Sequence, residues 1–195
     1  MVGTPGDGER RSFEAEILPH LDAAYNLARW LTRNEQDAED VTQEAVLRAF
    51  RFYGGFRGGN ARAWLLRIVR NTTYTWIEAN RRPEPTTEFD EQLPGLPQPR
   101  VAGTEETLIR AESAQALRKA MDQLPADQRE ILILREMEEM SYKEIAEVTG
   151  VPIGTVMSRL ARARSGLRAL LLKASRLPPE VENRQEFERT EAVER

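Results

Sequence analysis

The segment at residues 150–164, GVPIGTVMSRLARAR, carries side chains that can read and bind a nucleic acid. The hydroxyls of Thr155 and Ser158 and the guanidiniums of Arg159 and Arg162 can hydrogen bond to base edges or to phosphates. The segment contains no acid, although the whole chain has a net charge of −4. A bidentate contact from arginine to guanine is worth about 1 to 3 kcal/mol of base discrimination. We therefore take DNA recognition as the first hypothesis for this segment.

The residues around this segment predict a helix, a tight turn and a second helix. Ser141 and Glu144 have the spacing of a capping box, and Gly150 suits the left-handed turn that ends a helix. Pro152 fits the first turn of the next helix, because its nitrogen has no hydrogen to leave unpaired. One apolar stripe of the second helix comprises Ile153, Val156, Leu160, Ala163, Leu167 and Leu171. This pattern favours a helix-turn-helix, whose second helix lies in the major groove, over an ordinary bundle helix with a solvated basic face.

A second set of such side chains follows the glycine-rich loop YGGFRGGN. In a helix over residues 61–80, Arg67, Asn71 and Tyr74 share one side. The other side carries Trp64, Leu65, Ile68, Thr72 and Trp76. Aromatic, amide and guanidinium groups beside a flexible loop suit unstacked bases, which proteins hold by stacking and by hydrogen bonds to base edges. We expect the two tryptophans to pack in the core rather than to stack on bases.

An acidic cluster lies in the preceding segment, on a helix predicted over residues 35–53. Its expected buried side comprises Ala38, Val41, Ala45, Ala49 and Phe52. Asp37, Asp40, Gln43 and Glu44 fall on an exposed side. The residues alone favour a solvated acidic face, and a docking face for a basic protein is the other interpretation.

Charge is segregated along the chain. Residues 14–44 hold eight acids against two arginines, and residues 48–82 hold eight arginines against one glutamate. Residues 148–177 hold five arginines and one lysine with no acid. Two separate basic segments are compatible with nucleic-acid binding even in an acidic protein.

Composition narrows the class of protein. The chain has 195 residues and no cysteine, so a disulfide framework and a thiolate metal site are excluded. No apolar run approaches the roughly 20 residues that a membrane helix needs, and the N-terminus lacks the apolar middle of a signal peptide. We expect a cytoplasmic protein without membrane insertion.

The apolar spacing is helical nearly everywhere, which predicts an all-α fold. The expected helices cover residues 11–32, 35–53, 61–80, 105–123, 126–137, 141–149 and 153–175. They form two small domains, at 11–82 and 105–176, joined by a flexible, acidic, proline-rich linker at 83–104. Residues 1–10 and the acidic tail at 177–195 are expected to be disordered.

Three stretches together carry a family resemblance. They are DAEDVTQEAVLRAF at 37–50, FRGGNARAWLLRIVRN at 56–71 followed by RRP, and LPADQREILILREMEEMSYKEIAEVTGVPIGTVMSRLARAR at 124–164. In this order they resemble the bacterial extracytoplasmic-function sigma factors, group IV of the sigma-seventy family, over residues 12–175. The resemblance implies a sigma-two-like domain, a sigma-four-like helix-turn-helix domain, and a subunit that binds core RNA polymerase, recognises two promoter elements and helps to melt the DNA.

The resemblance also implies roles for individual residues. Those that match positions docking on the polymerase are Asp40, Gln43 and Glu44. Arg67, Asn71 and Thr75 match positions facing the minus-ten element, where Arg57, Asn60 and Tyr74 are further candidates. The loop at 54–60 matches the segment that captures a base flipped from the melted strand. In the C-terminal domain, Ser158, Arg159 and Arg162 match positions that read the minus-thirty-five element, with Gly154 and Thr155 nearby.

The partners implied are core RNA polymerase, through its beta-prime clamp helices and beta flap, promoter DNA as duplex and as melted single strand, and an anti-sigma factor. We expect no cofactor, no metal site and no catalytic residue. A stand-alone helix-turn-helix repressor is the main alternative, but it should supply a dimerisation surface. A recombinase would need a nucleophile or a carboxylate cluster in a scaffold with strands, and the sequence indicates neither.

Overall fold

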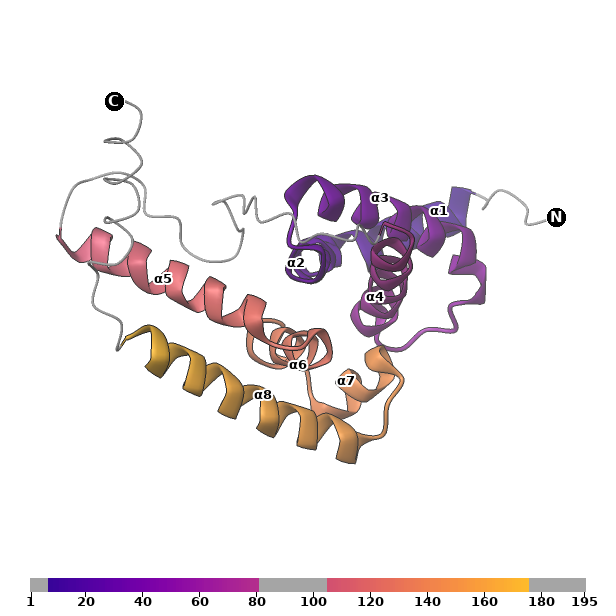
Figure 1. The fold of residues 1–195 in the computed structure, drawn as a ribbon. Coiled ribbons are helices and arrows are strands. Elements are labelled where there is room, and N and C mark those ends of the chain that lie inside the picture. The colour runs from indigo at the N-terminus through magenta and orange to yellow at the C-terminus, as the bar shows by residue number, and fades with distance from the viewer. Residues whose placement is uncertain (1–6, 81–104, 176–195) are drawn as a thin grey trace, which may run out of the picture.

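The computed structural model describes residues 7–80 and 105–175, with side chains except those of residues 7, 9 and 105–112. The helices are α1 (Asp7–Ile17), α2 (Leu21–Thr32), α3 (Glu35–Phe52), α4 (Ala61–Ala79), α5 (Glu105–Gln123), α6 (Ala126–Leu132), α7 (Tyr142–Thr149) and α8 (Ile153–Ala174). The short helical turns are η1 (Leu18–His20), η2 (Tyr53–Gly55) and η3 (Ile133–Met137). The all-α prediction is confirmed for the described residues (Figure 1). The predicted linker and tail lie outside them.

Two predicted helices are interrupted, and both interruptions have local causes. The helix expected at 11–32 breaks into α1 and α2, because Pro19 cannot donate the backbone hydrogen bond that a continuous helix needs. The helix expected at 126–137 ends as α6 and continues as the π-helical turn η3. In that turn the amide of Glu138 donates to the carbonyl of Ile133, 3.0 Å away, which spans five residues.

Helices α1 to α4 pack around a small apolar core with an aromatic edge. Leu27, Val41 and Leu65 are completely buried at its centre. The ring of Phe56 lies 5.0 Å from that of Trp64, so Trp64 packs on the core as expected, as does the half-buried Trp76. The prediction that Phe52 is buried is wrong: its side chain is 62% exposed at the last residue of α3.

Helices α5 to α8 form a second group, and here the predicted capping signals are confirmed. Ser141 accepts a hydrogen bond from the amide of Glu144, and the Glu144 carboxylate accepts from the amide of Ser141 at 2.7 Å. Gly150 ends α7 with a φ of 71°, the left-handed conformation that favours glycine. A side chain at Gly166 would lie 3.1 Å from Leu124, so glycine allows α8 to approach the end of α5 closely.

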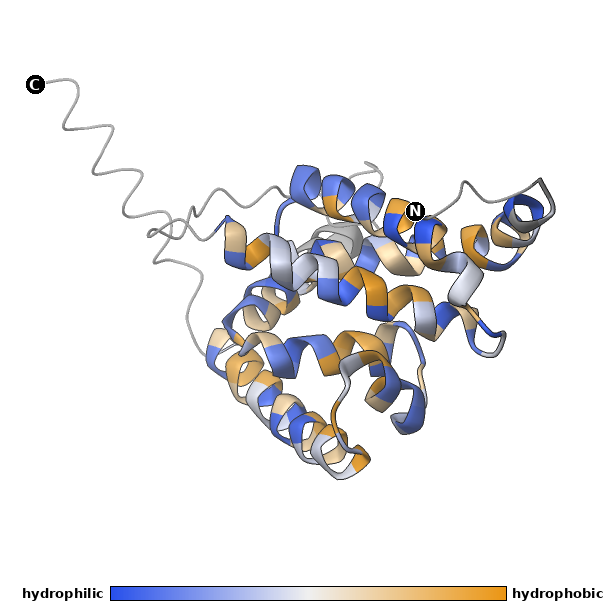
Figure 2. Cartoon of the chain, turned by 90° about the vertical axis from the view of Figure 1, so that its right-hand side faces the viewer, coloured by the Kyte–Doolittle hydropathy of each residue, from blue (hydrophilic) through white to orange (hydrophobic). Residues whose placement is uncertain are grey.

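The two helical groups pack against each other, which the linker sequence alone did not predict. Helix α4 contacts α7, and α2 contacts α6 (Figure 1). Figure 2 shows that the helices carry both hydrophilic and hydrophobic positions around their circumference. Glu130 of α6 is fully buried between the groups, and Arg62 of α4 donates to the backbone carbonyl of Glu138 at 2.7 Å and to its carboxylate. Charged side chains therefore contribute to the contact between the two helical groups.

Candidate nucleic-acid interface

The first turns of α8 present a polar surface with a buried apolar side behind it. Val156, Leu160 and Ala163 are buried against α6 and α7. Gly154, Ser158 and Arg162 are exposed, and Thr155 is half-buried. The predicted division of this helix into a buried apolar side and an exposed polar side is therefore present, with an exception at its beginning. Ile153 is 46% exposed, contrary to its predicted place in the buried stripe, because α8 begins there.

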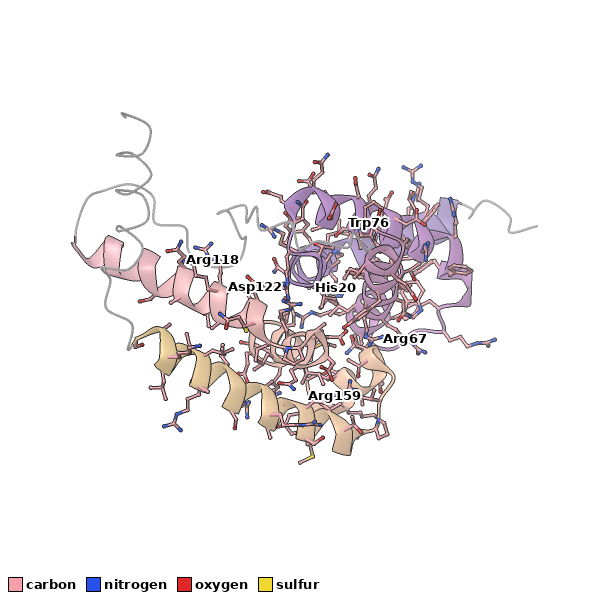
Figure 3. All side chains as sticks on the ribbon, in the orientation of Figure 1. His20, Arg67, Trp76, Arg118, Asp122 and Arg159 are labelled. Atoms are coloured by element: carbon pink, nitrogen blue, oxygen red, sulfur yellow. The ribbon has the colours of Figure 1, made fainter. Side chains whose placement is uncertain are left out.

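Arg159 differs from its exposed neighbours on α8 because its guanidinium forms an ion pair within the protein. Its side chain is 25% exposed, and its Nε lies 3.3 Å from Oδ2 of Asp127 in α6 (Figure 3). This ion pair orients the guanidinium, and Arg159 can bind a group outside the protein only by exchanging it. Exposed ion pairs contribute about 0 to 1 kcal/mol, so the exchange costs little.

Met157 belongs to this surface although the sequence interpretation omitted it. Its side chain is 52% exposed and lies beside Ser158 along α8. An exposed apolar group on a helix of this kind can contact the methyl group of thymine. The sequence pattern already indicated that Met157 is exposed, because this residue falls outside the apolar stripe formed by Val156 and Leu160.

Helix α4 presents a second exposed polar row. Arg67, Asn71 and Thr75 are exposed and follow one another at intervals of four residues, with the Thr75 hydroxyl donating to the carbonyl of Asn71 at 2.9 Å. Figure 3 shows Arg67 on this helix. In the loop before it, Arg57 is exposed, and Gly58 has a φ of 80°. The structure thus brings the loop and the start of this row to the same end of α4.

Two of the predicted minus-ten residues are instead in contact with the other helical group. Asn60 caps α4 by accepting from the amide of Ala63 at 2.9 Å, and its side-chain amide donates to the carboxylate of Glu144. The Tyr74 hydroxyl donates to Glu130 at 3.3 Å, and burial with the Glu130 charge raises the pKa of Tyr74. The Tyr74 side chain is therefore half-buried in this arrangement of the helices, whereas Asn60 stays exposed with its amide hydrogen bonded to Glu144.

Arg70 strengthens the same contact. Its Nε donates to the Glu130 carboxylate at 2.6 Å, and its guanidinium lies 4.8 Å from the centre of the Tyr74 ring. Glu130 is thus buried with a cation, a hydroxyl and the ring beside it. Burial raises the pKa of Glu130, although Arg70 opposes the shift.

The acidic surface of α3 faces solvent. Asp40 and Gln43 are exposed, and Glu44 is half-buried. Arg48 donates to the Glu44 carboxylate at 2.7 Å, and this hydrogen bond lowers the pKa of Glu44. Leu47 is 46% exposed on the same helix, so the surface combines acids with an apolar side chain. Sequence periodicity had not singled out Leu47.

Comparison with known proteins matches both helical groups. Residues 17–83 match the family model "Sigma-70 region 2", and residues 114–167 match "Sigma-70, region 4". The RNA polymerase sigma-H factor of Pseudomonas aeruginosa is 34% identical over 171 residues, covering 82% of this chain and 86% of the relative. This chain is an ECF sigma factor of the sigma-70 family. It directs transcription initiation and, as a sigma factor, is not an enzyme.

Further relatives and solved structures agree with this assignment. The ECF RNA polymerase sigma-E factor of Escherichia coli is 35% identical over 169 residues, covering 82% of this sigma factor and 86% of the relative. The sigma factor RpoE of Bartonella quintana, solved with the anti-sigma factor NepR, has a TM-score of 0.65 and 31% identity, with 83% of this chain and 97% of that chain covered. CnrH, solved with the cytosolic domain of CnrY, has a TM-score of 0.57 and 28% identity, with 83% and 88% covered.

A groove runs along the region-4 part of the sigma factor, away from the first turns of α8. It has a volume of about 490 Å³ and lies between α6, η3 and the C-terminal half of α8. Its apolar lining includes Leu132, Leu167 and Leu171, and Arg164 and Glu136 lie at its edge with 2.6 Å between Nη2 and Oε1. The groove is therefore lined mainly by leucines, with an ion pair at its edge.

Within residues 7–80 and 105–175, no group of histidine, aspartate or glutamate side chains has the arrangement of a metal site. The helices of this part of the sigma factor are also too short or too polar to cross a membrane.

The buried Glu130 gives a prediction for pH dependence. Its pKa is raised in the folded protein, so the wild type binds more protons when folded and loses stability as the pH rises through that pKa. Glutamine at this position does not titrate. We expect Glu130→Gln to gain stability relative to the wild type as the pH increases from about 4 to about 7, measured by urea unfolding at each pH.

Glu136→Gln is the matched control, because the Glu136 side chain is 50% exposed. Its stability relative to the wild type should change much less over the same interval. A relative stability of Glu130→Gln that falls with rising pH would contradict the raised pKa.

Proposed function

We propose that this sigma factor docks on core RNA polymerase through α3, reads the minus-thirty-five element with the first turns of α8, and captures melted minus-ten bases with α4 and the loop at 54–60. The observation that carries the proposal is the separation of three exposed surfaces, a polar and cationic one on each of α8 and α4 and an acidic one on α3. The sigma factor can therefore bind protein and DNA at the same time.

The minus-thirty-five reading rests on Ser158, Arg159 and Arg162, with Gly154 and Thr155 at the start of the helix. The buried stripe fixes the rotation of α8, so these positions share one outward side. Hydroxyls and guanidiniums match phosphates and the major-groove edges of bases. We add Met157 as a contact to a thymine methyl group.

Capture of minus-ten bases rests on the row of Arg67, Asn71 and Thr75 and on Arg57 in the loop. Asn60 and Tyr74 complete this surface only when Glu144 and Glu130 move away from them. We therefore propose that α4 separates from α6 and α7 before melted DNA binds. The energy for unstacking a flipped base, a few kcal/mol, is then recovered in the newly exposed surface.

Docking on the polymerase rests on Asp40, Gln43 and Glu44, with Leu47 as an apolar contact. Complementary charge favours a basic partner surface, as proposed for the beta-prime clamp helices. The groove between α6 and α8 is the proposed place for an apolar segment of the beta flap. The domain limits at 11–82 and 105–176 and the cytoplasmic location remain part of this proposal.

An anti-sigma factor is the proposed negative regulator. The support is the structure of RpoE from Bartonella quintana, which is bound to the anti-sigma factor NepR. Because the side chains of Asn60 and Tyr74 already hydrogen bond to the second helical group here, a regulator that holds this packing would keep these polar groups from DNA.

Run-off transcription with purified core RNA polymerase on a promoter library tests the function. We expect transcripts from a subset of promoters that share two elements, and none from core polymerase alone. Equal transcription of all promoters with and without the sigma factor would contradict the proposal. A repressor would instead bind its site without polymerase and would start no transcript.

A further inference from the structure

Three arginines and one aspartate meet where α2 packs against the second helical group. Arg33 donates from Nη2 to the backbone carbonyl of Asp122 at 2.7 Å, and its Nε lies 3.6 Å from Oδ1 of the same residue. Arg129 of α6 donates from Nη1 to that Oδ1 at 3.4 Å. Burial raises the pKa of Asp122, and the charges of Arg33, Arg129 and Arg29, which lies one turn before Arg33, oppose this shift. Figure 3 labels Asp122 at the end of α5 that faces α2.

The cluster has more positive charge and more donors than Asp122 can satisfy. Arg29 is 1% exposed, and its Nε, Nη1 and Nη2 make no hydrogen bond in the part of the sigma factor that the structure describes. Arg129 is 3% exposed, and its Nε is also unpaired. Burial, with the charge of Arg33, lowers the pKa of Arg129 to about 10. Buried charges without partners are costly, so this arrangement favours a second anion.

We propose that Arg29, Arg33 and Arg129 bind a small oxyanion of the phosphate class beside Asp122. Guanidinium groups present pairs of N–H donors that match the oxygens of such an anion. The ligand must be small, because Arg29 and Arg129 are nearly inaccessible. It enters on the side of Arg33, whose side chain is 45% exposed.

The bound anion also links the two helical groups. Arg29 lies in α2 and Arg33 directly follows that helix, whereas Arg129 and Asp122 belong to α6 and α5. An anion that contacts both sides replaces repulsion between the arginines with attraction. It therefore stabilises the packing in which Asn60 and Tyr74 hydrogen bond to the second helical group, and phosphate favours this packed form of the sigma factor.

Calorimetric titration of the full-length sigma factor with inorganic phosphate tests the site, with sodium chloride keeping the ionic strength constant. We expect saturable binding to the wild type and at least about tenfold weaker binding to Arg29→Gln, because charge-assisted hydrogen bonds are lost. Asp122→Asn should bind phosphate more tightly, because it removes the competing carboxylate. A merely structural role of Asp122 would not produce tighter binding.

Arg10→Gln is the charge-matched control, because Arg10 is exposed on α1 and pairs only with Glu14 among its described neighbours. It should bind phosphate as the wild type does. Arg33→Gln, at a half-exposed position, serves as a second variant if Arg29→Gln does not fold. Its binding should also weaken by about tenfold.

A short single-stranded oligonucleotide in place of phosphate distinguishes a free anion from the DNA backbone. We expect Arg29→Gln to leave oligonucleotide affinity unchanged, and a loss there would assign the cluster to DNA and overturn the proposal. Absence of saturable phosphate binding to the wild type, or binding to Arg29→Gln and Arg33→Gln that is as tight as to the wild type, would also overturn it.

Amide hydrogen exchange tests the link between the helical groups. Phosphate should slow exchange in α7, which contacts α4 away from the cluster, in the wild type but not in Arg29→Gln. Unchanged exchange in the wild type at saturating phosphate would contradict the link.

Discussion

Replacing Asp40 and Glu44 together by lysine is expected to weaken binding to core RNA polymerase by on the order of 100-fold. This loss should not depend on the promoter sequence. Both carboxylates lie on the acidic surface of α3, and reversing their charges replaces attraction by repulsion at the proposed docking surface. Loss of one partner of a buried charge pair at an interface costs about 2 to 5 kcal/mol. Surface plasmon resonance with immobilised core polymerase gives the affinity directly.

The charge-matched control is Glu14→Lys with Glu16→Lys, two exposed positions on α1. Glu14 pairs only weakly with Arg10, because both side chains are largely exposed. This variant should bind polymerase within about twofold of the wild type if steering by net charge is small. Equal losses in the two double variants would show that general charge, rather than α3, drives the association.

Replacing Arg159 by alanine is expected to reduce transcription about tenfold or more from promoters that depend on the minus-thirty-five element. The magnitude follows from the roughly 1 to 3 kcal/mol that a bidentate arginine contact contributes. Arg159 lies on the first turns of α8, far from the acidic surface of α3, so polymerase affinity should be unchanged. Run-off transcription on an intact promoter and on one with a scrambled upstream element separates these effects.

Two further variants sharpen this experiment. Asp127→Asn removes the carboxylate that holds Arg159 at 3.3 Å, so it should leave transcription equal or raise it. Lys173→Ala removes the same charge as Arg159→Ala but from the exposed end of α8, and it should have little effect. If Arg159→Ala impaired the scrambled promoter as strongly as the intact one, its role would not be the reading of that element.

Local sequence signals were sufficient for most helix boundaries. Ser141, Glu144 and Gly150 define the start and end of α7, because their hydrogen bonds connect residues within one turn. Asn34 starts α3 in the same way, accepting from the amide of Asp37 at 3.0 Å. The motifs around α3, α4 and α8 also identify the sigma-factor family, because their residue types and order are specific to it.

Periodicity was less reliable at helix ends and at interruptions. It placed Ile153 and Phe52 in buried stripes, yet both are exposed, because the pattern within one helix does not say where the neighbouring helices end. It also continued the first helix through Pro19, since the apolar spacing is the same on both sides of the break.

The sequence by itself determined the helices, their apolar sides and the family, because each depends on residues close together in the chain or on a matching motif. Only the tertiary structure decided that Tyr74 meets Glu130 and that Arg33 meets Asp122, pairs separated by 56 and 89 residues. No local pattern encodes such contacts, because they depend on how two helical groups joined by a linker pack together. For the same reason, the unpaired donors of Arg29 became visible only in the folded protein.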